Sequence, residues 1–158
     1  MKTVADLIRA HPFLHDLDDA AVALIAGCGS NTVFTAGDYV FREGNQADYF
    51  YLLRSGRVCL ETFVPGKGPV GFCTLREGNI LGVSWLIPPY RSRFDARVME
   101  TARAIAFDAE CLRGKCEADH HLGYALMKRF IPIVVDRLQT ARLQALDVYA
   151  APGEQQSA

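Results

Sequence analysis

The sequence predicts a mainly β protein with helices on both sides of one β unit. Apolar residues recur at helical spacing before residue 30 and again after Asp108, whereas from Ser30 to Asp108 apolar and polar residues alternate in short runs. Turn-forming residues divide this middle stretch at intervals of roughly 8 to 12 residues, which is typical of a β sandwich or a closed β barrel. We therefore expect one domain over residues 1–150, with strands over about 30–108 and C-terminal helices over about 109–150.

The N-terminal stretch predicts two short capped helices. Thr3 is placed to cap the first, with Asp6 three residues later, and Asp18 is placed to cap the second. Gly27 and Gly29 are expected to end the second helix. One face of that helix carries Ala21, Leu24, Ile25 and Cys28.

The β stretch predicts antiparallel strands joined by tight turns. One strand places Val58, Leu60, Thr62 and Val64 on one face, and Cys59, Glu61 and Phe63 on the other. The segment PGKGP, residues 65–69, is expected to form the tip of a hairpin.

After Asp108 the pattern predicts helix to about Ala150, interrupted between Arg113 and Asp119. Pro132 removes one helical hydrogen bond and is expected to kink the second of these helices. The apolar stripe is long enough to pack on the barrel and against a second copy of the chain, so we expect a homodimer through this helix. Its members are Leu126, Phe130, Ile133, Val134, Leu138, Ala141, Ala145 and Leu146. Residues 151–158 are expected to be a disordered tail.

Composition narrows the classes of function. The 158 residues are half apolar, 22% are charged, and the net charge of −1 is spread over both signs, which disfavours a nucleic-acid or membrane-surface protein. No leader-like segment and no apolar run of about 20 residues is present, so we expect a soluble cytoplasmic protein. The five cysteines are an odd number in a chain of this size, which favours free thiols in a reducing compartment.

The segment from Gly78 to Val98 has the features of an anion-binding cassette. Gly82 lets a ligand approach main-chain amides, and residues 83–87 can form about one helical turn with free N–H groups. Pro88 and Pro89 then stop that turn. Three arginines follow closely enough to reach one anion, namely Arg91, Arg93 and Arg97. Surface ion pairing is the alternative role for each arginine.

The glycine positions within this arrangement resemble those of the cyclic-nucleotide-binding domain family over about residues 10–148. The resemblance rests on REGNQADYFYLLRSGRV with Gly44 and Gly56, on Gly37 before DYVF, and on GNILG followed by an arginine eleven residues after Gly82. It implies a double-stranded β-helix (jelly-roll, cupin-like) barrel. It also implies a non-catalytic sensory domain that binds a cyclic nucleotide, such as cAMP or cGMP, or a related small anion and transmits binding through the long C-terminal helix.

The resemblance also assigns candidate ligand-binding residues. Arg93 lies at the family's phosphate-binding arginine, whereas Val83 replaces the glutamate that holds the ribose 2′-hydroxyl and Phe94 replaces a small residue. Loss of that hydroxyl partner weakens binding by about 1–3 kcal/mol. Trp85, Tyr90 and Phe94 either line a pocket for a different, partly apolar anion or fill it. Helical counting places Thr140 near the base. The full candidate set is Gly82, Val83, Ser84, Trp85, Arg93, Phe94 and Thr140.

Other kinds of site are disfavoured by the sequence. Residues 30–108 contain no histidine, which disfavours a metal enzyme inside the barrel. A metal or redox site could use Cys111, Cys116, His120 and His121, but their spacing matches no common pattern. No motif of covalent catalysis or of a phosphate loop is present, so we expect no enzyme, metal or cofactor.

Output is expected to go through a protein partner or a change of the dimer. The chain ends about ten residues after the long helix, so DNA binding by a domain that follows it is not expected. The alternative function is a degenerate, ligand-free module that acts through protein–protein interaction.

Overall fold

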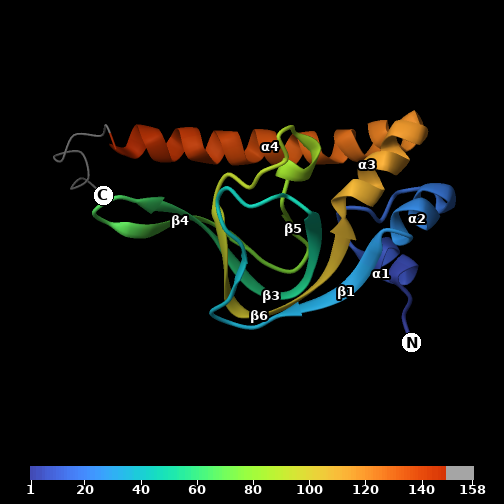
Figure 1. Cartoon of the computed structure of the whole chain (residues 1–158), viewed down its shortest axis with the longest axis horizontal. Coiled ribbons are helices and arrows are strands. Elements are labelled where there is room, and N and C mark those ends of the chain that lie inside the picture. The colour runs from blue at the N-terminus through green and yellow to red at the C-terminus, as the bar shows by residue number, and fades with distance from the viewer. Residues whose placement is uncertain (149–158) are drawn as a thin grey trace, which may run out of the picture.

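Two long strands, β3 (Tyr49–Val64) and β6 (Asp95–Asp108), form the centre of the sheet in the computed structural model, which describes residues 1–148. They pair antiparallel, from Tyr49 opposite Asp108 to Glu61 opposite Asp95. The strands β1 (Gly29–Phe34) and β2 (Tyr39–Phe41) pair with β6, while β4 (Gly68–Leu75) and β5 (Ile80–Leu81) pair with β3. Every pair is antiparallel, and the sheet curls into the predicted barrel (Figure 1).

The alternation of side chains along β3 and β6 separates two apolar cores. On β3, Phe50 and Leu52 face what we call the helix-side core, and Leu53 faces what we call the barrel core. On β6, Phe107 belongs to the helix-side core and Ala104 to the barrel core. A period of two along each strand is therefore enough to fill both sides of the sheet.

The two N-terminal helices are confirmed with their caps. In α1 (Val4–Ala10), the Thr3 side chain accepts from the Asp6 amide and the Asp6 carboxylate accepts from the Thr3 amide. In α2 (Asp19–Ala26), Asp18 accepts from the Ala21 amide, and Gly27 is the C-cap. Both helices pack at the end of the barrel where β1 begins (Figure 1).

The C-terminal helices differ in one respect from the prediction. The helix α3 (Ala109–Ala118) runs without a break through Gly114, so the expected interruption over Arg113–Asp119 was too wide. The chain leaves the helix only at Asp119, whose carboxylate accepts from the His121 and Leu122 amides and starts the next helix. The long α4 (His120–Val148) continues through Pro132 and lies along the barrel (Figure 1). The predicted tail, 151–158, lies outside the described residues.

A cluster of aromatic rings fixes α4 to the barrel. The Phe50 ring stacks on Trp85 at a centroid distance of 4.9 Å and on Phe107 at 4.8 Å, and Phe130 of α4 meets Phe50 edge-on at 5.4 Å. All four side chains are buried. Truncating a ring of this kind to alanine costs about 3–5 kcal/mol, so the cluster holds this part of α4 firmly.

The predicted face alternation on β3 fails at one point. Val58 and Leu60 are buried in the barrel core as expected, but Glu61 is also buried, at 2% exposure, and Thr62 is exposed. The register shifts between Leu60 and Glu61, so an irregularity in the β3–β4 pairing changes which faces are covered.

The expectation that all cysteines are free thiols was wrong for two of them. Cys28 and Cys111 form a disulfide, while Cys59, Cys73 and Cys116 are free. The pairing of β1 with β6 sets Gly29 opposite Phe107 and lets the Asp108 amide donate to the Cys28 carbonyl. The first turn of α3 then brings Cys111 over Cys28, which a count of cysteines could not reveal.

Among residues 1–148, no helix combines the length and apolar character that crossing a bilayer requires.

Candidate functional site

The cassette is a loop held between β5 and β6. Gly82 follows β5 with φ of +98°, a conformation that strongly favours glycine, and the 3-10 helix η1 (Ser84–Leu86) comes next. The Pro88–Pro89 peptide bond is cis, and Tyr90 has φ of 58°, which is unusual for a residue with a side chain. The predicted helical turn and its proline stop are therefore present.

The three cassette arginines have different surroundings. Arg91 donates from Nη1 to the Gly44 carbonyl at 2.9 Å, which joins the cassette to the turn before β3. Arg97 Nε lies 2.9 Å from Oε1 of the buried Glu61, an ion pair that lacks the alignment of a hydrogen bond. Arg93 is exposed, and its guanidinium has no hydrogen bond or ion pair within residues 1–148. Among the three cassette arginines, Arg93 is therefore the one whose guanidinium is available to bind a ligand.

Arg93 opens onto a cleft of about 470 Å³ at the rim of the barrel. Its walls come from Glu43, Gly44, Pro89, Arg91, Ser92 and Arg93. Reciprocal backbone bonds fix this rim, because the Gly44 amide donates to the Ser92 carbonyl and the Ser92 amide donates to the Asn45 carbonyl, each at 2.8 Å. The buried Asp95 accepts from the Glu43 amide at 2.7 Å and completes the frame.

Phe94 turns away from this cleft and into the barrel core. Its ring centroid lies 5.8 Å from Phe41 and 5.5 Å from Phe72. The three rings pack against the barrel core, which includes Leu60 and Leu81. Arg93 and Phe94 therefore point to opposite sides of the cassette backbone, at a bend of the chain directly before β6.

The remaining cassette candidates are mostly covered. Gly82 and Ser84 are buried and Val83 is half-buried. Trp85 is 0% exposed in the helix-side core, and its indole N–H has no acceptor within the described residues. As the structure stands, these four residues do not share the cleft that Arg93 lines.

Arg113 of α3 contacts the cassette, and the sequence analysis missed it. Its Nη1 donates to the Trp85 carbonyl at 2.7 Å, and its guanidinium lies over the Tyr90 ring, 4.0 Å from the centroid. The cation therefore ties η1 and the strained Tyr90 to the start of the C-terminal helices. The only available signal was an arginine in the stretch that we expected to be an interruption.

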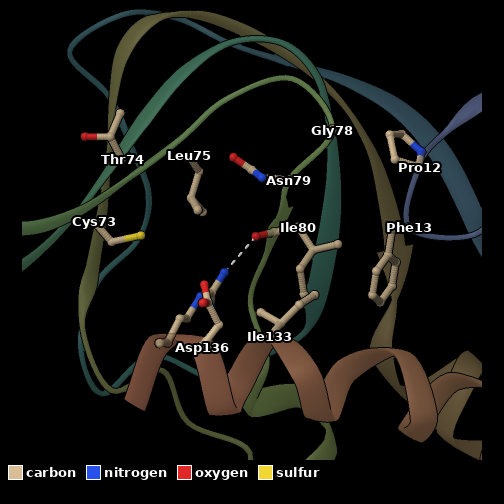
Figure 2. A pocket seen from close by; sticks show the side chains of 11 residues that line it. Pro12, Phe13, Cys73, Thr74, Leu75, Gly78, Asn79, Ile80, Ile133 and Asp136 are labelled. Carbon is tan, nitrogen blue, oxygen red and sulfur yellow. Dashed lines mark hydrogen bonds between the residues drawn. The ribbon is translucent and has the colours of Figure 1, made fainter. Parts of the chain in front are cut away.

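On α4 the structure separates Thr140 from the barrel and brings Arg137 onto it. Thr140 is exposed, whereas Arg137 donates from Nη2 to the Ile80 carbonyl at 2.9 Å. The dashed line at Ile80 in Figure 2 marks this bond. Burial lowers the pKa of the Arg137 guanidinium, and its Nη1 has no partner within residues 1–148. The spacing Phe130, Ile133, Arg137 continues the barrel-facing side of the helix, and this was the signal that could have identified Arg137.

A cavity of about 430 Å³ lies beside Arg137, between α4 and the β4–β5 turn (Figure 2). Its walls are Pro12, Phe13, Cys73, Thr74, Leu75, Gly78, Asn79, Ile80, Ile133, Asp136 and Arg137. This cavity and the Arg93 cleft share no lining residue, so Arg93 and Arg137 line two different pockets.

Comparison with known proteins agrees with this architecture. Residues 31–119 match the family described as the cyclic nucleotide-binding domain. The chain is 30% identical over 119 residues to cyclic nucleotide-gated ion channel 18 of Arabidopsis thaliana. That match covers 68% of this chain but 17% of the channel, so the chain spans about a sixth of the channel's length.

Two solved structures share the fold. A Geobacter metallireducens GS-15 protein named for cyclic nucleotide binding is 30% identical, with a TM-score of 0.77 over 87% of this chain and 99% of that one. The catabolite activator protein of Thermus thermophilus is 21% identical, with a TM-score of 0.69 over 87% of this chain and 62% of that one. The jelly-roll barrel, the cassette between β5 and β6 and the matched residues together show that the chain belongs to the cyclic nucleotide-binding domain family.

Proposed function

We propose that this chain is a non-catalytic sensory domain in which Arg93 binds the phosphate of a cyclic nucleotide, or a related small anion. The observation that supports it most directly is the Arg93 guanidinium, exposed and unpaired within residues 1–148, while Arg91 and Arg97 have protein partners. A guanidinium presents a planar set of donors that suits a phosphate. The Gly82, Val83 and Ser84 backbone is proposed as the second half of the site. It joins the Arg93 cleft only if η1 moves, because these residues do not line that cleft as the structure stands.

Binding at the cassette is proposed to act on the C-terminal helices through two contacts. Arg113 of α3 donates to the Trp85 carbonyl, and Phe130 of α4 meets the Trp85 ring edge-on at a centroid distance of 5.6 Å. A shift of η1 would therefore move groups on both helices. The ligand shifts the helix position only by the difference between its affinities for the two positions. In this proposal Trp85 transmits the movement of η1 to the helices and does not touch the ligand. Thr140 contacts the ligand only if α4 moves towards the barrel.

A homodimer through α4 is the proposed quaternary state. Apolar residues repeat with alternating steps of three and four on the exposed side of this helix, which is the spacing of a two-stranded coiled coil. They are Tyr124, Met127, Ile131, Val134, Leu138, Ala141 and Ala145. Leu138 is 67% exposed, so a second copy would cover a row that the single chain leaves in water.

A second candidate function is supported by the rings inside the barrel. The Phe94 ring contacts both Phe41 and Phe72 against the barrel core, so in this candidate the space available to a base and ribose is reduced. In this candidate the domain binds no nucleotide and acts through a protein partner.

A cytoplasmic location stays a prediction. Free thiols in all five cysteines were one reason for expecting it, and the Cys28–Cys111 disulfide removes that reason.

Titration calorimetry separates the two candidates. Wild type, Arg93→Ala and Arg103→Ala are titrated with cAMP, cGMP and 5′-AMP; Arg103 is an exposed arginine of β6 and serves as the matched control. We expect binding heat when wild type is titrated with at least one of these nucleotides. Arg93→Ala should lose about 1.5–3 kcal/mol of binding free energy, and Arg103→Ala should bind with the wild-type affinity. Equal heats for the two variants would exclude Arg93. Absence of heat in wild type, with binding restored by Phe94→Ala, would favour the filled barrel.

A further inference from the structure

The disulfide between Cys28 and Cys111 joins two segments that are 83 residues apart in the sequence. Their Cα atoms lie 5.9 Å apart, within the usual range for this bond. Cys28 lies between the C-cap of α2 and the start of β1, and Cys111 lies in the first turn of α3. The bond therefore connects the N-terminal helices to the first of the C-terminal helices.

Two hydrogen bonds hold the same junction without the sulfurs. The Asp108 amide donates to the Cys28 carbonyl at 2.9 Å, and Lys115 Nζ donates to the Leu24 carbonyl at 2.7 Å. Both remain possible when the cysteines are reduced. Reduction therefore breaks the covalent link between these segments, leaves both hydrogen bonds in place and keeps the two sulfurs close enough to pair again.

The two paired cysteines differ in access. Cys28 is 8% exposed, whereas Cys111 is half-buried, so a reagent from solvent reaches Cys111 first. Burial raises the pKa of the Cys59 and Cys116 thiols, which disfavours the thiolate, the reacting form, at these two positions. Cys116 lies on α3 as well, so it is a natural control.

We propose that Cys28 and Cys111 form a redox-controlled clamp that sets how tightly α3 is held to the N-terminal helices. The Cys111 thiolate attacks one sulfur of a small disulfide such as oxidised glutathione, a mixed disulfide forms, and one glutathione thiolate leaves. The Cys28 thiolate then attacks the Cys111 sulfur and releases the second glutathione. Two protein thiols lose two electrons and two protons, and one glutathione disulfide becomes two thiols. Reduced glutathione reverses both steps.

The clamp acts on the helix that also contacts the cassette. Arg113, two residues after Cys111, donates to the Trp85 carbonyl. An oxidised pair therefore restricts the helix that carries this contact. The clamp needs no ligand, and it acts whether or not the cassette binds a nucleotide.

Mass spectrometry with thiol alkylation tests the bond. The chain is equilibrated with reduced and oxidised glutathione at a series of ratios, treated with N-ethylmaleimide and digested. We expect Cys28 and Cys111 to lose their label together as the oxidised fraction rises, while Cys59, Cys73 and Cys116 stay labelled. Labelling of all five cysteines throughout, or a stable mixed disulfide at Cys111 with Cys28 still labelled, would overturn the pair.

Hydrogen exchange tests the clamp. Amides of α3, residues 109–118, are expected to exchange at least tenfold faster in the reduced protein than in the oxidised protein. Cys116→Ser should keep this difference, and both Cys111→Ser and Cys28→Ser should exchange at the reduced rate in every buffer. Identical exchange of α3 in the two redox states of wild type would show that the bond does not restrain the helix, and this outcome needs no variant to fold.

Discussion

Arg113 reaches from α3 to donate to the Trp85 carbonyl at 2.7 Å while its guanidinium covers the Tyr90 ring. One side chain thus joins the cassette to the C-terminal helices, although the two contacted residues lie 28 and 23 positions earlier in the chain. A charged donor on a carbonyl and a cation over a ring each stabilise by about 1–2 kcal/mol when partly buried. Arg113 is therefore a structural link between the proposed site and the helices.

Replacing Arg113 by alanine should lower the free energy of unfolding by about 1–3 kcal/mol, because the carbonyl and the ring both lose their partner. Urea unfolding followed by circular dichroism measures the change. Amide exchange of residues 84–90 should rise in the same variant. Arg103→Ala removes an exposed arginine without these contacts and should change neither quantity; a similar loss in both variants would mean that the contact adds nothing beyond charge.

Replacing Val83 by glutamate should increase affinity for cAMP roughly ten- to a hundredfold, provided the barrel admits the ribose. Val83 is the residue before η1 and is half-buried, so a carboxylate there can meet a ribose hydroxyl. Val83→Leu is the control for size, and calorimetry gives the affinity. Val83→Glu with no higher affinity for cAMP than Val83→Leu would contradict this expectation. If the double variant Val83→Glu/Phe94→Ala then binds cAMP more tightly, the Phe94 ring is the obstacle.

Replacing Leu138 by glutamate should convert the proposed dimer to a monomer, because it places a charge within the apolar row that the second copy would cover. Size-exclusion chromatography with light scattering reads the mass directly. Gln139→Glu adds the same charge at the neighbouring exposed position and should leave the dimer intact. A wild type that elutes with the mass of one chain at all concentrations would end the dimer proposal.

Stability should fall as the pH is lowered because His11 is held neutral in the fold. Its Nε2–H donates to the Leu53 carbonyl at 3.1 Å, and its Nδ1 accepts from the Phe13 amide at 3.2 Å, which leaves no site for a second proton. Burial lowers the pKa of His11 below its usual value of 6.5. The unfolded chain therefore takes up the proton first, and the stabilisation that is complete above about pH 6.5 is lost as the pH falls below it.

The unfolding free energy of wild type, measured at pH values from 7.5 to 5, should therefore slope downward by at most about 1.4 kcal/mol per pH unit from this group. His11→Gln should be less stable at pH 7.5 and show a flatter slope. His15→Gln alters an exposed histidine and should keep the wild-type slope. An unchanged slope in His11→Gln would assign the effect to other groups.

Local sequence signals identified the elements of the fold well. The caps at Thr3 and Asp18, the change of period near residues 30 and 108, and the glycine and proline positions of the cassette all describe interactions within a few residues. They were confirmed because such interactions do not depend on what packs above them. The alternation on β3 failed at Glu61 because the β3–β4 register shifts there, and the buried carboxylate pairs with Arg97 of the neighbouring strand β6.

The candidate site was predicted less completely, since its members come from distant parts of the chain. Three outcomes depend on the register of β3 and β6 and on where α3 and α4 lie. They are the directions of Arg93 and Phe94, the contacts of Arg113 and Arg137, and the pairing of Cys28 with Cys111. No local pattern contains that register.

The sequence by itself determined the kind of protein: its alternating period, its capped helices and its cassette glycines specify a barrel of this family, because backbone conformation and the burial of alternate side chains are local physical choices. The tertiary structure alone decided which cassette arginine has no partner within residues 1–148, which rings pack against the barrel core and which thiols pair. Those outcomes depend on packing between segments tens of residues apart, where burial of apolar surface sets the arrangement and polar groups take the partners that remain.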